Sequence, residues 1–200
     1  MSKQAVIMLH GVGSSGENLQ GLVNYWTESL PNTLVIAPNA PFPFDQGPGY
    51  QWFSVTGISD ETRPLRITQA RKSFDLSIQA VLEEHQLDPQ HDQIILAGFS
   101  QGSIMALDLL VSSRLPIAGV VAFSGRLSSP EPYSKSQEQA VLLIHGQKDP
   151  VIACSESQIA AQRLSDLGYK VETQYEPDTL HSISNEGAAK AAKFIAQRFS

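Results

Sequence analysis

The sequence predicts one α/β domain spanning residues 1–200, with a mostly parallel central sheet flanked by helices. Short apolar runs alternate with stretches of helical periodicity along the whole chain. Hydrophobic residues make up 42% of the 200 residues, or about 84, which is enough for one sizeable core and too few for two. Only 17% of the residues are charged, which argues against a disordered chain.

Six segments have the character of strands. Five short, nearly continuous apolar runs are typical of strands buried on both faces, as in a parallel sheet. They are residues 5–9, 33–37, 93–99, 117–123 and 141–144. Residues 169–175 alternate more strongly between apolar and polar side chains and form the expected sixth strand.

Helical stretches lie between these runs. Over residues 65–82, apolar side chains recur at spacings near 3.6. The other expected helices are residues 18–30, 103–113, 154–167 and 185–199. Strands and helices that alternate in this way predict right-handed crossovers, and ligands of such sheets bind at the carboxyl ends of the strands. The residues that directly follow each strand are therefore the candidates for a functional site.

Composition excludes several classes of function. Fourteen basic and twenty acidic residues give a formal charge of −6 and a pI near 5.3. A net negative charge is not typical of a nucleic-acid-binding protein, and it gives no attraction to an anionic membrane. The chain has a single cysteine, Cys154, so it cannot form an internal disulfide. One thiol is also too few ligands for a structural zinc site. We expect Cys154 to be a small packing residue.

The chain has no segment typical of a secretory signal or a membrane span. The apolar run at residues 5–9 is shorter than the roughly 7–15 apolar residues of a signal and the roughly 20 of a span. We therefore expect a soluble, cytoplasmic protein without stable membrane insertion. The oligomeric state is not readable from the sequence, and a homodimer is left open.

Residues 38–57 form an unusual loop. The segment combines four prolines and three glycines with five aromatic residues: Phe42, Phe44, Tyr50, Trp52 and Phe53. A polar linker would not carry so many aromatic side chains, and long ordered loops in compact domains are commonly functional. We expect Trp52 to border a pocket, whereas Phe42 and Phe44 fit a pocket or a small satellite core equally well.

Two glycine-rich motifs each follow a strand and precede a helix. Residues 11–16 match G-x-G-x-x-G, the fingerprint of dinucleotide-binding proteins. The acidic residue expected about 20 residues later is missing, because the second strand ends Ile36-Ala37-Pro38-Asn39. Glu17 would also face a pyrophosphate. A glycine-rich turn is therefore the preferred interpretation, and no cofactor is expected.

The second motif, residues 98–102, is Gly-Phe-Ser-Gln-Gly and matches the G-x-S-x-G nucleophile elbow. It lies between the apolar strand 93–99 and the expected helix from 103. Such a turn holds its serine, here Ser100, in a strained conformation with the hydroxyl above the sheet. Side chains at Gly98 and Gly102 would collide with the neighbouring backbone. The following helix directs its N-terminus at the site.

A nucleophilic serine needs a base, and histidine suits that role. His85 and His91 lie in polar surroundings, and His10 and His145 each end a strand and are expected to stabilise loops near the site. His181, in the loop before the last helix, leaves room for an acid between the serine and itself, which is the order of elbow-type hydrolases.

The expected acid is Asp149, in the turn that follows strand 141–144. Its rivals Glu156 and Asp166 fall on a helix, and Asp178 lies in the loop of His181 itself. Asp149 would fix the tautomer of the imidazole and stabilise the imidazolium. The tetrahedral intermediate needs two donors, for which the backbone amides of Gln101 and Val12 are the candidates.

Five segments together resemble the phospholipase/carboxylesterase family of α/β hydrolases, which includes bacterial carboxylesterases and acyl-protein thioesterases. The segments are LHGVG (9–13), QWF (51–53), GFSQG (98–102), HGQKDPV (145–151) and LHSI (180–183). They occur in the order of the family and cover nearly the whole chain. QWFSVTGIS (51–59) is especially similar to the bacterial serine esterases of the group.

The resemblance implies an α/β-hydrolase fold without a large cap domain. It implies Ser100, Asp149 and His181 as the triad and the Val12 and Gln101 amides as the oxyanion hole. It also implies a substrate pocket at Trp52, Phe53 and Ile152. Val12 replaces the usual leucine, which alters shape and leaves the amide in place. The chain is slightly short for the family, so any lid is expected to be reduced.

The expected activity is hydrolysis of small-molecule carboxylic esters with small to medium acyl groups, through an acyl-enzyme. An acyl-protein thioesterase or a lysophospholipase is the alternative, because the chemistry is shared. A non-catalytic binding protein on the same fold is a more distant alternative, since none of the three triad residues is lost.

Overall fold

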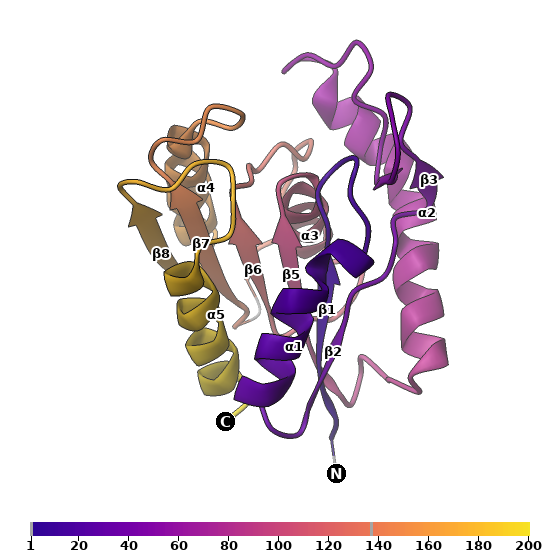
Figure 1. The fold of residues 1–200 in the computed structure, drawn as a ribbon, viewed down its shortest axis with the longest axis vertical. Helices are drawn as coiled ribbons and strands as arrows, with labels where there is room; N and C mark the ends of the chain where they lie inside the picture. The colour runs from indigo at the N-terminus through magenta and orange to yellow at the C-terminus, as the bar shows by residue number, and fades with distance from the viewer. Residues whose placement is uncertain (1, 137) are drawn as a thin grey trace.

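The computed structural model describes residues 2–136 and 138–200. Six strands form one sheet in the order β2-β1-β5-β6-β7-β8, and every neighbouring pair is parallel (Figure 1). Their bounds are β1 (Gln4–Leu9), β2 (Thr33–Ile36), β5 (Gln93–Phe99), β6 (Gly119–Phe123), β7 (Ala140–Gly146) and β8 (Lys170–Glu176). The structure confirms the six predicted strands within a few residues at each end.

Helices cover both faces of the sheet. A short 3-10 helix, η1 (Glu17–Leu19), is followed by α1 (Gln20–Ser29), α2 (Arg63–Glu84), α3 (Gln101–Ser112), α4 (Cys154–Asp166) and α5 (Asn185–Arg198). Helices α1 and α5 lie on one face, and α2, α3 and α4 on the other (Figure 1). The helix predicted at 18–30 is thus divided into η1 and α1, and α3 begins two residues earlier than predicted because it starts directly after Ser100.

The two faces of each central strand belong to different cores. Along β1, Ala5, Ile7 and Leu9 pack with residues of α2 and α3, whereas Val6 and Met8 pack with residues of α1 and α5. All five side chains are at most 2% exposed. Burial on both faces is the physical reason why these strands read as continuous apolar runs.

The segment at residues 38–57 contains a small hairpin that the periodicity did not predict. Strands β3 (Phe42–Pro43) and β4 (Tyr50–Gln51) pair antiparallel. The hairpin is tied to the turn after β1, because the Gly13 amide donates to Tyr50 O at 2.8 Å and the Tyr50 amide donates to Ser14 O at 2.8 Å. Strands of two residues are too short to show an alternating pattern.

None of the helices in the described part of the chain has the length and apolar character that crossing a membrane requires. The loops that follow β1, β5, β7 and β8 all leave the same edge of the sheet, at the top of Figure 1. This edge carries the candidate site residues.

Candidate active site

Ser100 occupies the sharp turn between β5 and α3. Its φ of 53° and ψ of −116° are a strained conformation for a residue with a side chain. The turn is tight because a Cβ on Gly98 would lie 2.4 Å from the carbonyl carbon of Gly102, and a Cβ on Gly102 would lie 2.1 Å from Leu9 O. The chain can therefore make this turn only with glycine at both positions.

His181 lies in the loop between β8 and α5 and reaches the serine. Its Nε2 is 2.9 Å from Ser100 Oγ, and its Nδ1 is 2.7 Å from Asp149 Oδ2. The ring of Phe99, the last residue of β5, lies 4.8 Å from the imidazole centroid to centroid. The structure thus brings together the serine, histidine and aspartate that the sequence singled out, in one hydrogen-bonded row.

Asp149 follows β7, and hydrogen-bond donors hold both oxygens of its carboxylate. Oδ1 accepts from the amides of Val151 (2.8 Å) and Ile152 (2.9 Å), and Oδ2 accepts from His181. Burial pushes the pKa of Asp149 upward, but the hydrogen bonds from His181, Ile152 and Val151 outweigh it and hold the pKa below its ordinary value. The carboxylate is therefore ionised at neutral pH and fixed in orientation.

His145, expected to stabilise a loop, packs against this carboxylate. Its Nε2 lies 2.8 Å from Ile152 O and 3.2 Å from Asp149 Oδ2, and its Nδ1 lies 2.6 Å from Ser157 Oγ. The Ile152 carbonyl accepts a hydrogen bond from Nε2, so Nε2 carries a proton, and Ser157 Oγ contacts both Nδ1 and the Gly125 carbonyl oxygen, the latter at 3.4 Å. Sequence reasoning missed the contact with Asp149, and the available signal was the four-residue spacing within one turn.

The two candidate oxyanion donors belong to two different turns, one after β1 and one after β5. Gln101 is the first residue of α3, so its amide has no acceptor within the helix. Val12 belongs to the turn after β1, where a Cβ on Gly11 would lie 3.4 Å from the Cβ of Ser100. This turn is held directly against the serine, and no acceptor within the described residues takes the Val12 amide.

The three residues predicted to form a pocket lie mainly in the interior. Trp52, Phe53 and Ile152 are 0%, 4% and 6% exposed. The Trp52 ring packs edge-on against Phe74, with centroids 5.4 Å apart. Their role in binding the acyl group stays a prediction.

Two exposed apolar side chains flank the row of polar residues, and sequence reasoning missed them. Val151 and Leu180 are 63% and 56% exposed, and they lie beside Asp149 and His181 in the chain. Apolar residues inside otherwise polar loops were the signal that was available.

Cys154 begins α4 near the acid. Burial, together with the charge of Asp149, raises the pKa of its thiol, so the thiol is protonated at neutral pH and a poor nucleophile. Across residues 2–136 and 138–200, no three histidine, cysteine, aspartate or glutamate side chains gather as a metal site requires.

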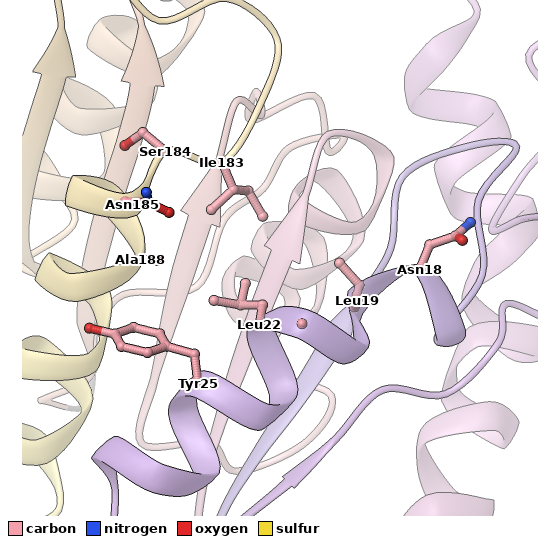
Figure 2. A pocket seen from close by; sticks show the side chains of 9 residues that line it. Asn18, Leu19, Leu22, Tyr25, Ile183, Ser184, Asn185 and Ala188 are labelled. Carbon is pink, nitrogen blue, oxygen red and sulfur yellow. The ribbon is translucent and has the colours of Figure 1, made fainter.

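A pocket of about 420 Å³ lies between α1 and the start of α5 (Figure 2). Leu22 and Tyr25 from α1 face Ile183, Ser184 and Asn185 from the loop and helix that follow His181. Ser100, Asp149 and His181 are not among its lining residues.

Comparison with known proteins gives a consistent result. The pattern that defines the Phospholipase/Carboxylesterase family matches residues 1–198. Esterase YpfH of Escherichia coli (strain K12) is 29% identical over 92% of this chain and 78% of its own. Acyl-protein thioesterase 1 of Candida albicans is 30% identical over 97% of this chain and 91% of its own.

Solved structures agree with the fold. The crystal structure of esterase PE8 superposes with a TM-score of 0.86 at 33% identity, covering 98% of this chain and 93% of that one. The Bacillus cereus carboxylesterase superposes with a TM-score of 0.81 at 20% identity, over 98% and 89% of the two chains. The six-stranded parallel sheet, the serine on its sharp turn and the full-length family match lead to one conclusion: the chain belongs to the phospholipase/carboxylesterase family and has the α/β-hydrolase fold.

Proposed function

We propose that the protein is a serine carboxylesterase that hydrolyses small-molecule esters with small to medium acyl groups. The observation that carries this proposal is the row Ser100–His181–Asp149, with contacts of 2.9 and 2.7 Å at the carboxyl edge of the sheet. The family membership and the similarity to esterases PE8 and YpfH support the same class of reaction.

Each residue has a defined task in this proposal. Ser100 Oγ attacks the ester carbonyl while its proton passes to His181 Nε2, and Asp149 stabilises the imidazolium. The Val12 and Gln101 amides bind the oxyanion of the tetrahedral intermediate. The intermediate expels the alcohol, which takes the proton from His181. Water then attacks the acyl-enzyme by the same route and releases the acid and free Ser100.

The proposal is tested by replacing the nucleophile. Ser100→Ala should lower kcat on an aryl ester by about 10⁴-fold or more, because the triad acts as a unit. Ser77→Ala is the matched control, since its hydroxyl bonds only to Ser73 O on α2. A fluorophosphonate should label Ser100, as read by mass spectrometry. Near-normal turnover of Ser100→Ala, or an adduct on another residue, would refute the proposal.

A thioesterase acting on acylated proteins is the second candidate. The observation that favours it is the 30% identity to acyl-protein thioesterase 1 of Candida albicans over nearly the whole chain. Parallel kinetics on an oxygen ester and a thioester of the same acyl group separate the two. We further propose that residues 1–200 act as one domain and that the protein works in the cytoplasm. A measurement of its mass in solution decides whether it forms a homodimer.

A further inference from the structure

His10 ends β1 directly before the turn that carries Val12, and it is fully buried. Both of its ring nitrogens have partners. Nδ1 lies 2.7 Å from the carbonyl oxygen of Gly11, the next residue, and Nε2 lies 2.9 Å from the amide nitrogen of Ala40. The proposed reaction gives this side chain no task.

These partners determine the tautomer of His10. The Ala40 amide is a donor, so Nε2 must be the acceptor and carry no proton. The Gly11 carbonyl is an acceptor, so Nδ1 must carry the proton. Burial lowers the pKa of His10, and the bond to the Gly11 carbonyl offsets this only in part. The imidazole is therefore neutral at neutral pH, with a defined direction for each hydrogen bond.

The Gly11 carbonyl that His10 binds belongs to the same peptide unit as the Val12 N–H. A trans peptide is planar, so the carbonyl of Gly11 and the amide N–H of Val12 point in opposite directions. Fixing the Gly11 oxygen therefore fixes the direction of the Val12 N–H. The Ser14 amide also donates to the Gly11 oxygen, at 3.2 Å, so this oxygen is held from two sides.

His10 is itself braced by the aromatic residues of the 38–57 segment. Trp52 Nε1 donates to the His10 carbonyl at 2.9 Å, and the two rings lie 5.4 Å apart. The Tyr50 ring lies 6.4 Å from the imidazole. A residue locked by packing and by hydrogen bonds on every polar atom is suited to hold a catalytic group in place.

We propose that His10 is a positioning residue for the oxyanion hole, which holds the Gly11 carbonyl so that the Val12 amide is aimed at the reacting carbonyl. This inference rests on the proposed function, because it gives the oxyanion an amide of the turn after β1. A positioning role differs from a packing role because it depends on one ring nitrogen. Only the Nδ1 donor acts on the Gly11–Val12 peptide, whereas the Nε2 acceptor binds the Ala40 amide.

The two roles are separated by a matched pair of variants. The side-chain amide of His10→Asn occupies the place of Nδ1 and retains a donor to Gly11, whereas that of His10→Gln occupies the place of Nε2 and retains an acceptor for Ala40. We expect His10→Gln to lose about 10- to 100-fold in kcat with KM within about twofold, and His10→Asn to stay within about threefold of wild type. Phe74→Leu is the control for destabilisation near Trp52, because the Phe74 ring packs edge-on against Trp52.

An inhibitor provides an independent reading. A trifluoromethyl ketone forms a tetrahedral adduct whose oxyanion occupies the same hole, so its inhibition constant should rise in parallel with the loss of kcat/KM across the variants. Equal losses of kcat in His10→Asn and His10→Gln, or losses that follow the melting temperature as in Phe74→Leu, overturn the inference. Neither result bears on the proposed function, which is tested separately by the Ser100→Ala variant.

The tautomer is tested on the unaltered protein, so the inference does not depend on variants that fold. Nitrogen-15 NMR of histidine-labelled protein at pH 7 should show a neutral imidazole for His10 with the proton on Nδ1. A proton on Nε2, or a charged ring, overturns the inference.

Discussion

The side chain of Gln101 holds the backbone of Trp52. Its Oε1 accepts from the Trp52 amide at 2.7 Å, and its Nε2 donates to Phe53 O at 2.7 Å. Gln101 is 3% exposed and directly follows Ser100, so the segment after β4 is anchored to the turn that carries Ser100. Gln101 therefore contributes its backbone to the proposed oxyanion hole and its side chain to the placement of the loop.

Removing this side chain should loosen the loop. Gln101→Ala leaves the Trp52 amide and the Phe53 carbonyl buried without partners, which costs about 1–3 kcal/mol for an unpaired group. We expect faster hydrogen exchange at the Trp52 amide and a kcat/KM about tenfold lower. Gln79→Ala, which removes an exposed glutamine bonded to Glu83 on α2, is the control. Unchanged exchange at Trp52 would contradict the anchoring role.

The Nε2–H group of His145, which donates to Ile152 O and lies 3.2 Å from Asp149 Oδ2, should affect the response to acid. His145→Gln retains a donor near the position of Nε2, whereas His145→Phe removes it. Asp149 has a lowered pKa, so it stabilises the fold above about 3.9, the pKa of an unfolded aspartate, and this contribution is lost as pH falls through its folded-state pKa. Loss of the polar N–H group beside this carboxylate raises that pKa. Acid unfolding of His145→Phe should therefore begin at higher pH than that of His145→Gln, as followed by circular dichroism, and coincident curves would contradict it.

The strands and the hydrogen-bonded row of Ser100, His181 and Asp149 were predictable because each leaves a local signal. Two-sided burial makes β1 and β5 continuous apolar runs, and the strained turn at Ser100 requires glycine at two fixed offsets. Chain order then selected His181 and Asp149, because both follow strands that end at the same edge of the sheet.

The supporting contacts were not predictable, because they join residues that are distant in the sequence. Gln101 and Trp52 are 49 residues apart, and His10 and Ala40 are 30 apart. The sequence of the proline- and glycine-rich loop did not show that Trp52 is fully buried and packs against Phe74, and its role in a pocket stays a prediction. In a stretch without regular structure, the spacing of apolar residues does not indicate whether a side chain points into the core or toward solvent.

A buried ion pair between α2 and α3 should matter for stability and not for chemistry. Asp108 has no exposed side-chain surface, and its carboxylate accepts from Arg71 (2.8 and 3.0 Å) and Arg114 (2.8 Å). Asp108→Ala leaves the Arg71 guanidinium without its carboxylate partner, whereas Arg114 keeps Asp75 at 2.9 Å, and we expect a loss of about 3–5 kcal/mol in the free energy of unfolding. Activity per folded molecule should be unchanged.

The control for this prediction is an exposed pair. Asp60→Ala removes a carboxylate that is 85% exposed and bonded to Arg63 and Arg126, so it should cost far less stability than Asp108→Ala. Urea unfolding of both variants measures the difference. Equal losses in the two variants would show that burial of Asp108 carries no special weight.

His10 should make the fold sensitive to mild acid. Its folded-state pKa lies below the value of about 6.5 for an unfolded histidine, because burial disfavours the charged ring, and the Tyr50 and Trp52 rings that face it offer no charge to compensate. Below pH 6.5 the unfolded chain takes up the proton first. The contribution of His10 is therefore complete above pH 6.5 and decreases as pH falls toward the folded-state pKa, by at most about 1.4 kcal/mol per pH unit.

His10→Asn removes this titration while keeping a donor to the Gly11 carbonyl. Urea unfolding at pH 8, 7, 6 and 5 should give wild-type and variant curves that run parallel above pH 7 and converge below 6.5, because only the wild type continues to lose stability through this residue. The difference between the two curves cancels the other ionisable groups, including buried His145. Curves that stay parallel down to pH 5 would mean that His10 takes up its proton equally well in the folded and unfolded chain, which contradicts a neutral ring held between Gly11 and Ala40.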